Sequence, residues 1–271
     1  FAMPTVPIDH HSRAYAGSDV YMSMFQPTAS GPWIGNLKKY SLNSRGDIAS
    51  CGSQEAIMDG SGQIRDSARS CWSQTTDGGA VDSGGAGAVL LATAASERRI
   101  YANISEVIAD LTHRDNAFSI DNPDLVPADF GMSGDQELSD LVNTVRGLNK
   151  EWKLGDFNHS QPAVAVYETE ADDFHSYVFA GANDGLLHCF DDADGHETWA
   201  FVPREQFSRL RYANADGHRY FMDGSPVVAD TRQGQKILIC GERRGGNHYY
   251  ALDISDIQAP VFLYTHISGG Q

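Results

Sequence analysis

Short apolar runs alternate with polar turns over the second half of the chain, and the pattern occurs twice. The first unit covers residues 159–201 and the second covers residues 224–263. Matching positions are 64 residues apart for Pro162 and Pro226, 60 apart for Gly181 and Gly241, and 62 apart for Asp191 and Asp253.

Each unit has the content of one four-stranded blade of a β-propeller, because it holds four apolar runs separated by turn residues. The period is longer than the roughly 40–50 residues of the commoner propeller repeats. A single blade cannot bury both faces of its sheet, so it must stack against neighbours. We therefore predict a mainly β protein in which residues 151–271 form about two four-stranded blades. Residues 1–48 should supply strands to the same ring, which is incomplete at Gln271.

The strand rhythm is lost over residues 49–150, where the pattern predicts a helix-containing insertion. Two sets of apolar residues fall at i, i+3, i+4 and i+7, the spacing of one helix face. Ser133 and Gln136 are spaced like a capping box before the second set, and Gly147 is placed to close that helix. The two sets are Ile104, Val107, Ile108 and Leu111, and Leu138, Leu141, Val142 and Val145.

Turn residues between the apolar runs indicate where the blade strands reverse. A short Asn-Asp-Gly segment between two such runs is a strong hairpin signal, and a type I′ turn needs positive φ at both central residues. A second turn segment opens the next blade. The residues expected to hold these two turns are Asn183, Asp184 and Gly185, and Asp223, Gly224 and Pro226.

The charge of the chain disfavours nucleic-acid binding. With 20 Lys and Arg against 36 Asp and Glu, the formal net charge is −16 over 271 residues, whereas nucleic-acid binders present basic stripes. No apolar run approaches the roughly 18 residues of a membrane span. The four cysteines, Cys51, Cys71, Cys189 and Cys240, fit two disulfides in an oxidising compartment or four buried thiols.

One acidic stretch, residues 191–197, has the composition of a calcium loop, since Ca²⁺ takes several oxygen ligands from a short segment. The second unit has residues 253–256 in the same place without the extra acids. A repeated turn between blade strands therefore explains the stretch better than a metal site does, and we expect no metal ligands in this segment.

Other chemical motifs are incomplete or occupy structural positions. The glycine-rich residues 84–87 lack the preceding strand and the Lys-Ser/Thr ending of a phosphate loop. His159 and His188 lie at strand positions of the repeat, where hydrogen bonding and packing are the expected roles. Neither a GxSxG elbow nor an HExxH motif is present. We expect no catalytic residues and no bound cofactor.

Several sequence blocks, in order along the chain, resemble the C-terminal domain of PilY-family proteins, which are type IV pilus biogenesis factors and tip-associated adhesins. They cover most of the chain. The blocks are residues 33–40 (WIGNLKKY), 67–72 (SARSCW), 152–160 (WKLGDFNHS), 181–188 (GANDGLLH), 222–226 (MDGSP) and 245–253 (GGNHYYALD).

This resemblance implies a modified β-propeller, similar in shape to the quinoprotein dehydrogenases, that is secreted to the periplasm. It implies display at the pilus tip or cell surface, associated with the outer membrane or secreted. Minor pilins and the pilus tip complex are the implied partners. A host or surface receptor would be bound through the large variable N-terminal region of the family. Some members bind calcium in an acidic propeller loop, which has no counterpart before Gln271.

Secretion makes a disulfide between Cys51 and Cys71 the expected pairing. The two residues are 20 apart and flank a glycine-containing segment that is unlikely to pack well alone. For Cys189 and Cys240, two buried thiols are expected in preference to a second bridge.

The tripeptide Arg45-Gly46-Asp47 has the sequence that integrin receptors recognise on exposed loops. Gly46 is also the turn glycine of a strand ending, and this structural role is the preferred interpretation.

The sequence thus predicts a type IV pilus assembly and adhesion module that acts by binding and not by turnover. One alternative is a periplasmic dehydrogenase that holds pyrroloquinoline quinone, for which Trp33, Trp72, Trp152 and Trp199 are available as stacking residues. Similarity of fold alone is weak support for that activity. A second alternative is a periplasmic scaffold propeller unrelated to pili.

Overall fold

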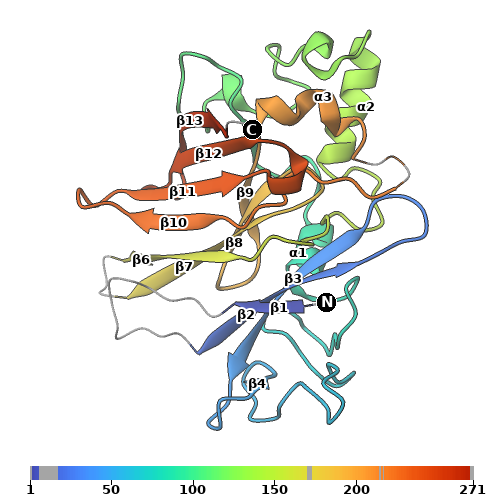
Figure 1. Ribbon diagram of the computed structural model, residues 1–271, viewed down its shortest axis with the longest axis vertical. Helices are drawn as coiled ribbons and strands as arrows, with labels where there is room; N and C mark the ends of the chain where they lie inside the picture. Colours follow the sequence, from blue (N-terminus) through green and yellow to red (C-terminus); the bar gives the residue numbers. More distant parts are fainter. Residues whose placement is uncertain (1, 6–17, 170–172, 214, 216, 269–271) are drawn as a thin grey trace.

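Three β-sheets stacked on one another form the framework of the protein, which confirms the predicted mainly β class (Figure 1). The computed structural model describes residues 2–5, 18–169, 173–213, 215 and 217–268. Residues 6–17 of the region predicted as N-terminal strands lie outside the described residues, and so does Gln271 at the predicted end of the ring. The first sheet consists of β1 (Ala2–Thr5), β2 (Asp19–Gln26), β3 (Ile34–Leu42) and β4 (Ile48–Ala49).

The middle and last sheets each contain four consecutive antiparallel strands, one sheet for each sequence repeat. The middle sheet has a fifth strand, β5 (Ile100–Ala102), which pairs in parallel with β9 (Glu197–Val202). The predicted insertion, residues 49–150, therefore contributes a strand to this blade. This strand was not expected from the sequence pattern. The middle sheet has β6 (Ala163–Glu168), β7 (Phe174–Gly181), β8 (Leu187–Asp191) and β9 (Glu197–Val202), and the last has β10 (Val227–Asp230), β11 (Lys236–Gly241), β12 (His248–Asp253) and β13 (Val261–Ile267).

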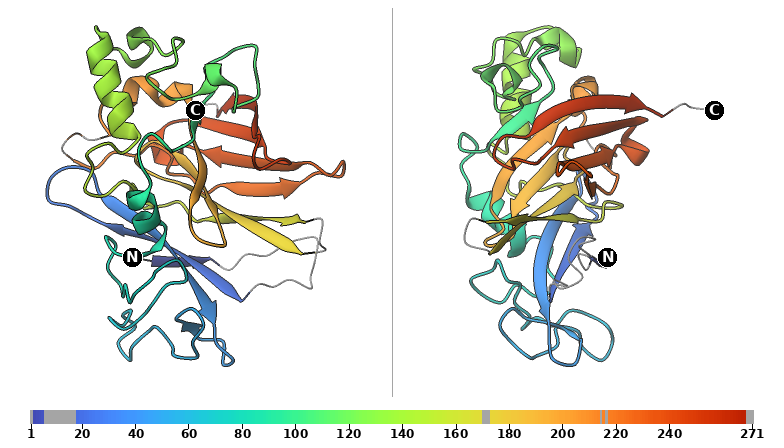
Figure 2. Two further views of the ribbon diagram at one scale, coloured as in Figure 1. Left: turned by 180° about the vertical axis from the view of Figure 1, so that it is seen from behind. Right: turned by 90° about the vertical axis from the view of Figure 1, so that its left-hand side faces the viewer.

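Alternate side chains of the middle sheet enter two different hydrophobic cores. Val178 and Phe190 pack with residues of the first sheet, whereas Phe179 and Cys189 pack with residues of the last sheet. This division follows from the two-residue period of a strand, which places successive side chains on opposite faces. The middle sheet is therefore buried on both faces, and the views in Figure 2 show it between the other two.

The helices lie at the margins of the sheets. α1 packs against β3, and α2 and α3 lie together near one end of the last two sheets (Figure 1). The α-helices are α1 (Gly85–Ala92), α2 (Asp135–Val145) and α3 (Phe207–Leu210), and the 3-10 turns are η1 (Arg114–Asn116), η2 (Pro127–Phe130), η3 (Arg204–Gln206) and η4 (Arg243–Gly245).

The second of the two predicted insertion helices is present as α2. Its four predicted apolar residues, including Leu138 and Val145, are all buried. Gly147 follows the helix with a φ of 89°, as expected for a closing glycine. The predicted capping box is wrong, because Gly134 is the N-cap and Glu137 accepts the hydrogen bond from the Ser133 N–H.

The predicted helix over residues 104–111 is wrong, although its apolar spacing is helical. The side-chain amide of Asn116 donates to the carbonyls of Ile108 and Asp110, and its oxygen accepts from the Ser105 N–H. The Leu111 N–H donates to Pro260, beside β13. The backbone groups that a helix would pair internally are thus bonded elsewhere, and Val107 is 92% exposed.

A buried chain of four charged groups joins the insertion to the middle sheet. The Arg98 guanidinium donates two hydrogen bonds to Glu197 on β9, at 2.7 and 2.8 Å. Glu197 also contacts His188 Nδ1 on β8 at 2.7 Å, and His188 Nε2 lies 3.2 Å from the Asp184 carboxylate. All four side chains are at least nine-tenths buried. Each buried charge therefore has an opposite partner, which burial requires.

Burial alone would lower the pKa of His188, but the carboxylates of Asp184 and Glu197 outweigh burial and raise the pKa to about 9. Burial would raise the pKa of Glu197, and here Arg98 and His188 prevail and hold it well below its usual value. His188 is consequently an imidazolium at neutral pH, with both ring nitrogens donating.

The hairpin between β7 and β8 has the predicted residues but a different turn type. Ala182 N–H donates to Leu186, so the loop has three residues, and Gly185 alone among them has a positive φ, of 100°. A three-residue loop of a type I turn followed by a left-handed residue has this form. The expected two-residue type I′ turn is therefore wrong. The loop has a third residue, Gly185, and its positive φ lets the chain reverse direction.

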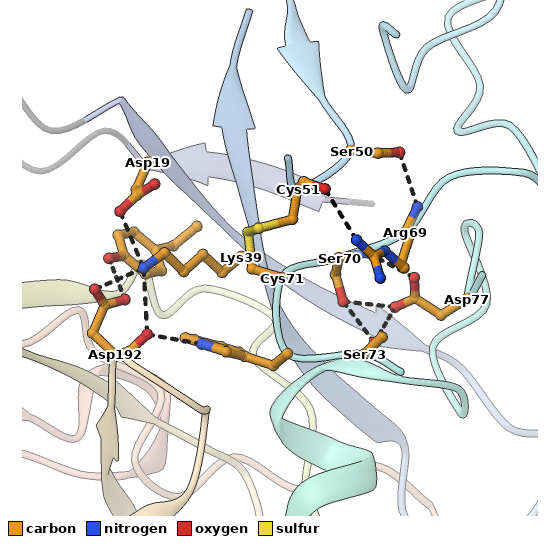
Figure 3. Close-up of a disulfide and its surroundings, with 12 residues drawn as sticks. Asp19, Lys39, Ser50, Cys51, Arg69, Ser70, Cys71, Ser73, Asp77 and Asp192 are labelled. Atoms are coloured by element: carbon orange, nitrogen blue, oxygen red, sulfur yellow. Dashed lines mark hydrogen bonds and ion pairs between the residues drawn. A yellow bond between two sulfur atoms is a disulfide. The ribbon is translucent and has the colours of Figure 1, made fainter. Parts of the chain in front are cut away.

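The long segment after β4 is held by a disulfide and by polar anchors (Figure 3). Cys51 and Cys71 form the predicted disulfide, with 4.8 Å between their Cα atoms. Nearby, the buried Asp77 carboxylate accepts hydrogen bonds from the hydroxyls of Ser70 and Ser73 and pairs with Lys38 at 3.1 Å. This segment has few strands. The disulfide and the polar contacts therefore hold it in place, as backbone hydrogen bonds between strands do in the sheets.

The other two cysteines, Cys189 and Cys240, are buried free thiols. Burial raises the pKa of Cys240 to about 12. A thiol with so high a pKa is almost entirely protonated at neutral pH and is therefore a weak nucleophile.

Removing the disulfide should destabilise the protein. We expect replacement of both Cys51 and Cys71 by Ser to lower the free energy of unfolding by about 3 kcal/mol, because the open loop gains entropy in the unfolded chain. Denaturant unfolding with and without reductant measures this effect. Reductant should lower the midpoint of the wild type and leave that of the double variant unchanged. An unchanged wild-type midpoint would contradict the prediction.

Gly185 should tolerate a side chain less well than Gly234, a turn glycine with a φ of 83° and open space around it. A Cβ on Gly185 would lie 2.5 Å from Leu210 Cδ2. Valine is strained by the positive φ at both positions, but only in Gly185→Val does the new side chain also clash with Leu210. Gly185→Val should therefore be less stable than Gly234→Val by about 1 kcal/mol. Equal unfolding midpoints for the two variants would refute the steric part of this argument.

Stability should fall as the pH rises from 6.5 through 9. The pKa of His188 is about 9 in the folded protein against 6.5 for the free side chain, so its stabilising contribution is complete below 6.5 and lost through 9. Thermal unfolding midpoints measured across this range should drop for the wild type. His188→Gln should remove most of that drop, whereas the exposed His196→Gln on the same hairpin should keep it. A His188→Gln profile identical to the wild type would count against the imidazolium.

Candidate functional site

A cluster of polar side chains lies between the middle and last sheets, next to the loops that lead into them. We call it the junction cluster. It consists of His159, Asp156, Asn183, His218 and Asp223. All five belong to loops at the ends of strands, and all are at least partly buried. These loops meet because the middle and last sheets stack on each other.

His159 and Asp223 form the direct link between the blades. They are 64 residues apart, the same offset as the repeat, so they occupy equivalent positions in the two units. His159 Nδ1 lies 2.8 Å from an oxygen of Asp223, whose side chain is fully buried. The expected hydrogen-bonding role of His159 thus has a specific partner.

Asn183, one of the predicted turn residues, connects the two carboxylates of the cluster. Its amide nitrogen donates to Asp156 at 2.8 Å and lies 3.4 Å from Asp223. Its oxygen accepts from the Phe221 N–H at 2.9 Å. Asp156 in turn contacts His218 Nε2 at 3.0 Å. Asn183 therefore fixes the hairpin of one blade to the loop that leads into the next.

Tyr220 lies beside both histidines of the cluster. Its ring centroid is 5.6 Å from that of His159 and 4.5 Å from that of His218. The Trp33 ring lies 4.0 Å from His218 on another side, and the Arg244 guanidinium lies over the Tyr220 ring at 5.4 Å. This group is the aromatic wall of the junction cluster.

Two His–Asp pairs have the composition of general acid–base groups. The hydroxyls closest in sequence to the His159–Asp223 pair are those of Ser160 and Ser225. Ser160 accepts the Gly181 N–H, and Ser225 accepts the Gln161 N–H and donates to the His159 carbonyl. Both hydroxyls therefore bond to backbone groups of the loops and strands. The contacts of the cluster thus hold the blades together.

The remaining predicted turn residues of the second blade lie against the same junction. Gly224 N–H donates to the Gly241 carbonyl at 3.1 Å, and a Cβ on Gly224 would lie 2.2 Å from that oxygen. Pro226 is buried directly before β10. The close approach of the two backbones explains the glycine.

A cavity of about 480 Å³ lies beside the junction cluster. It is bounded by the start of β3, the end of α1, the segment before β6 and the β7–β8 hairpin. The turn residues Asn183 and Asp184 both form part of its wall. The residues that line it are Pro32, Trp33, Ile34, Asp82, Leu91, Lys150, Glu151, Trp152, Lys153, Leu154, Gly155, Asn183, Asp184 and Ala213.

The carboxylates of the acidic stretch at residues 191–197 point to separate partners. Asp192 pairs with Lys39 and accepts from the Tyr21 hydroxyl, Asp191 contacts His175, and Glu197 belongs to the buried charge chain. Among the described residues, three or more His, Cys, Asp or Glu side chains nowhere come together in a way that would hold a metal ion. These acids therefore fit turn and ion-pair roles better than calcium ligation.

Residues 84–87 begin helix α1 and contact β3. The Gly85 N–H donates to the Ser73 hydroxyl and the Gly87 N–H donates to the Asn36 side chain, so these donors are already used. A Cβ on Gly87 would lie 2.1 Å from the Trp152 ring. Close packing of the helix explains the glycines.

Arg45, Gly46 and Asp47 lie at the exposed turn between β3 and β4. The Asn43 side chain accepts hydrogen bonds from the N–H groups of Arg45 and Asp47, and Gly46 has a φ of 83°. Arg45 and Asp47 pair with each other at 3.3 Å and are 74% and 50% exposed. The geometry is that of a turn, and recognition by a receptor stays a prediction.

No sequence motif marks four of the residues described here, which are Asp156, His218, Tyr220 and Lys150. They lie in irregular loops whose partners are far away in the sequence. A signal was available for the link between His159 and Asp223, because the repeat offset of 64 aligns these two residues.

Within the described part of the chain, no helix is long and apolar enough to cross a bilayer. The blade region matches a known family. Residues 158–268 match the family described as the PilY1 beta-propeller domain.

Two curated relatives are both named for type IV pilus biogenesis. The type IV pilus biogenesis factor PilY1 of Pseudomonas aeruginosa strain PAO1 is 46% identical over 87 residues, which is 29% of this chain and 7% of that protein. The PilY1 homolog of Xylella fastidiosa strain Temecula1 is 38% identical over 100 residues, which is 35% of this chain and 8% of that protein. The matched segments thus span less than a tenth of these relatives.

The crystal structure of the Pseudomonas aeruginosa PilY1 C-terminal domain is 38% identical in sequence and covers 34% of this chain and 18% of that one. The TM-score is 0.27, so the superposition says nothing about the arrangement of the blades. The family match over residues 158–268 covers the two blades and includes three of the blocks identified from the sequence, residues 181–188, 222–226 and 245–253. Residues 158–268 therefore match the PilY1 beta-propeller domain, and the chain is similar to PilY-family proteins.

Proposed function

We propose that this chain is a type IV pilus assembly and tip-associated adhesion module that acts by protein–protein binding. The observation that carries the proposal is the family match over residues 158–268, together with relatives named as type IV pilus biogenesis factors. The first sheet, the insertion and the two blades would act as one rigid binding body.

The stacked sheets support a binding role because they form a rigid support for exposed side chains. The face of the last sheet that points away from the middle sheet carries Val227, Tyr249 and Tyr264, which are 58%, 46% and 55% exposed. Several large apolar side chains gathered on one surface commonly mark a contact with another protein. This face is the part of the described structure best suited to a pilin-like partner.

Minor pilins of the pilus tip complex are the partners we propose, with a location from the periplasm to the cell surface at the pilus tip. The disulfide between Cys51 and Cys71 supports this location, since structural disulfides form and persist in oxidising compartments. The acidic character of the chain, with a net charge of −16, favours partners other than nucleic acid.

A non-enzymatic role is part of the proposal. The four tryptophans named for quinone stacking have separate structural roles. The Trp199 indole N–H donates to Ile257, that of Trp72 to Asp192, and that of Trp152 to Gly35, while Trp33 stacks with Phe25. These contacts favour structural positions over a shared stacking site.

Deleting residues 158–268 in frame from the complete gene product should reduce surface pili and twitching motility severalfold in the organism that encodes it. The reason is that the deletion removes the two blades that are proposed to bind the pilins. Sheared pili are quantified by immunoblot, and the truncated product is checked for stable expression. The matched control, Gln233→Ala, alters an exposed turn of the last sheet and should leave piliation unchanged.

The deciding comparison is with the enzymatic alternative. Minor pilins should co-purify with the wild-type protein and be lost with the deletion. Unchanged pili in the deletion strain, combined with oxidation of alcohols or sugars by the purified protein with added quinone and calcium, would replace the binding proposal by the dehydrogenase.

A further inference from the structure

The cavity beside the junction cluster combines apolar walls with two lysines, Lys150 and Lys153. Trp33, Ile34, Leu91 and Trp152 supply apolar surface, and Lys150 lies among them. A volume of about 480 Å³ is within the range of ligand pockets, which are mostly apolar with a few polar groups that orient the ligand.

Lys150 differs from the other cations around the cavity because its ammonium has no close protein acceptor. Within the described residues, it takes part in no side-chain hydrogen bond and no ion pair. By contrast, Lys153 donates to the carbonyls of Leu91 and Thr93, and Arg98 pairs with Glu197. The Lys150 ammonium is attracted by the Asp184 carboxylate only at longer range.

The carboxylate in the cavity wall, Asp184, and the one behind it, Glu197, are already matched by other cations. Asp184 faces His188 and also accepts the Gly155 N–H at 3.0 Å, and Glu197 is shared by Arg98 and His188. Burial lowers the pKa of Lys150, and the positive charge of Arg98 lowers it further, against the attraction of Asp184.

Two further cations near this wall, Lys153 and Arg146, are bound only by backbone carbonyls within the described chain. Asp82 and Glu151 line the rim, where they are exposed and screened by water. The inner wall of the cavity consequently has an excess of positive charge, although the whole chain has a net charge of −16.

We propose that the cavity binds a carboxylate attached to an aromatic or branched apolar group. The Lys150 ammonium would form the ion pair with the carboxylate, and the indoles of Trp33 and Trp152 would contact the apolar part. A charge-assisted hydrogen bond of this kind is among the strong polar contacts in proteins.

A singly charged carboxylate fits better than a phosphate. Phosphate sites commonly use an arginine fork or a nest of free backbone N–H groups. The lining of this cavity contains lysines and no arginine, and the N–H groups of Gly85 and Gly87 at the nearby helix start are bonded to Ser73 and Asn36. The inference goes beyond the proposed function, and each stands without the other.

Isothermal titration calorimetry on the 271-residue chain tests the proposal with N-acetyl-phenylalanine as the probe. The uncharged N-acetyl-phenylalanine amide is the control ligand and should bind at least about tenfold more weakly, because it lacks the charge-assisted bond. Inorganic phosphate should not compete. The source of the carboxylate is distinguished by two short peptides, one ending in Phe with a free carboxyl terminus and one amidated with an internal Glu before Phe.

Lys150→Met should weaken binding of N-acetyl-phenylalanine by about tenfold or more, whereas Lys150→Arg should retain much of it. Lys236→Met, which removes a lysine paired with Asp230 on the last sheet, should leave the affinity unchanged. The thermal midpoint of unliganded Lys150→Met should equal or exceed that of the wild type, because a half-buried ammonium without a protein acceptor is removed. That measurement separates loss of binding from loss of folding.

Three results would overturn the proposal. They are an amide that binds as tightly as the acid, a folded Lys150→Met protein that binds as the wild type does, and failure of the wild type to bind any of the carboxylate probes at millimolar concentration.

Discussion

The architecture depends on a sheet that is apolar on both faces. Along β7 the side chains of Val178 and Phe179 belong to different hydrophobic cores, so neither face of the middle sheet is stable in water. Stacking is the solution available to such a sheet, and it requires a neighbour on each side. The first and last sheets fill these positions, and the loops that form the junction cluster are brought together as a result.

The charge chain explains how an irregular insertion is fixed to a regular stack. Arg98 comes from the insertion and Glu197 from β9, and their double hydrogen bond is fully buried. Directly beyond Arg98, β5 adds to β9 in parallel. The geometry of a two-bond contact between a guanidinium and a carboxylate is narrow, so it sets the register of the insertion against the blade. Asp184, at the other end of the chain, is thereby held at the wall of the cavity.

The sequence was a good guide where structure follows local periodicity and a poor one where distant loops meet. The repeat and its turn glycines predicted the strands of both blades, and the apolar spacing of Leu138 to Val145 predicted α2. The same spacing failed over residues 104–111, because the side chain of Asn116 binds the backbone there. Lys150 and Trp33 are 117 residues apart in the sequence, so their shared cavity follows only from the stacking of the sheets.

The two copies of the repeat differ at the position where they contact each other, which is His159 in the first and Asp223 in the second. Two carboxylates or two imidazolium rings at this separation would repel each other. A histidine in one copy and an aspartate in the other make the joint directional instead of symmetric. A blade sequence averaged over the two copies would lose this complementarity, so the order of the blades is encoded by the difference between the repeats and not by their likeness.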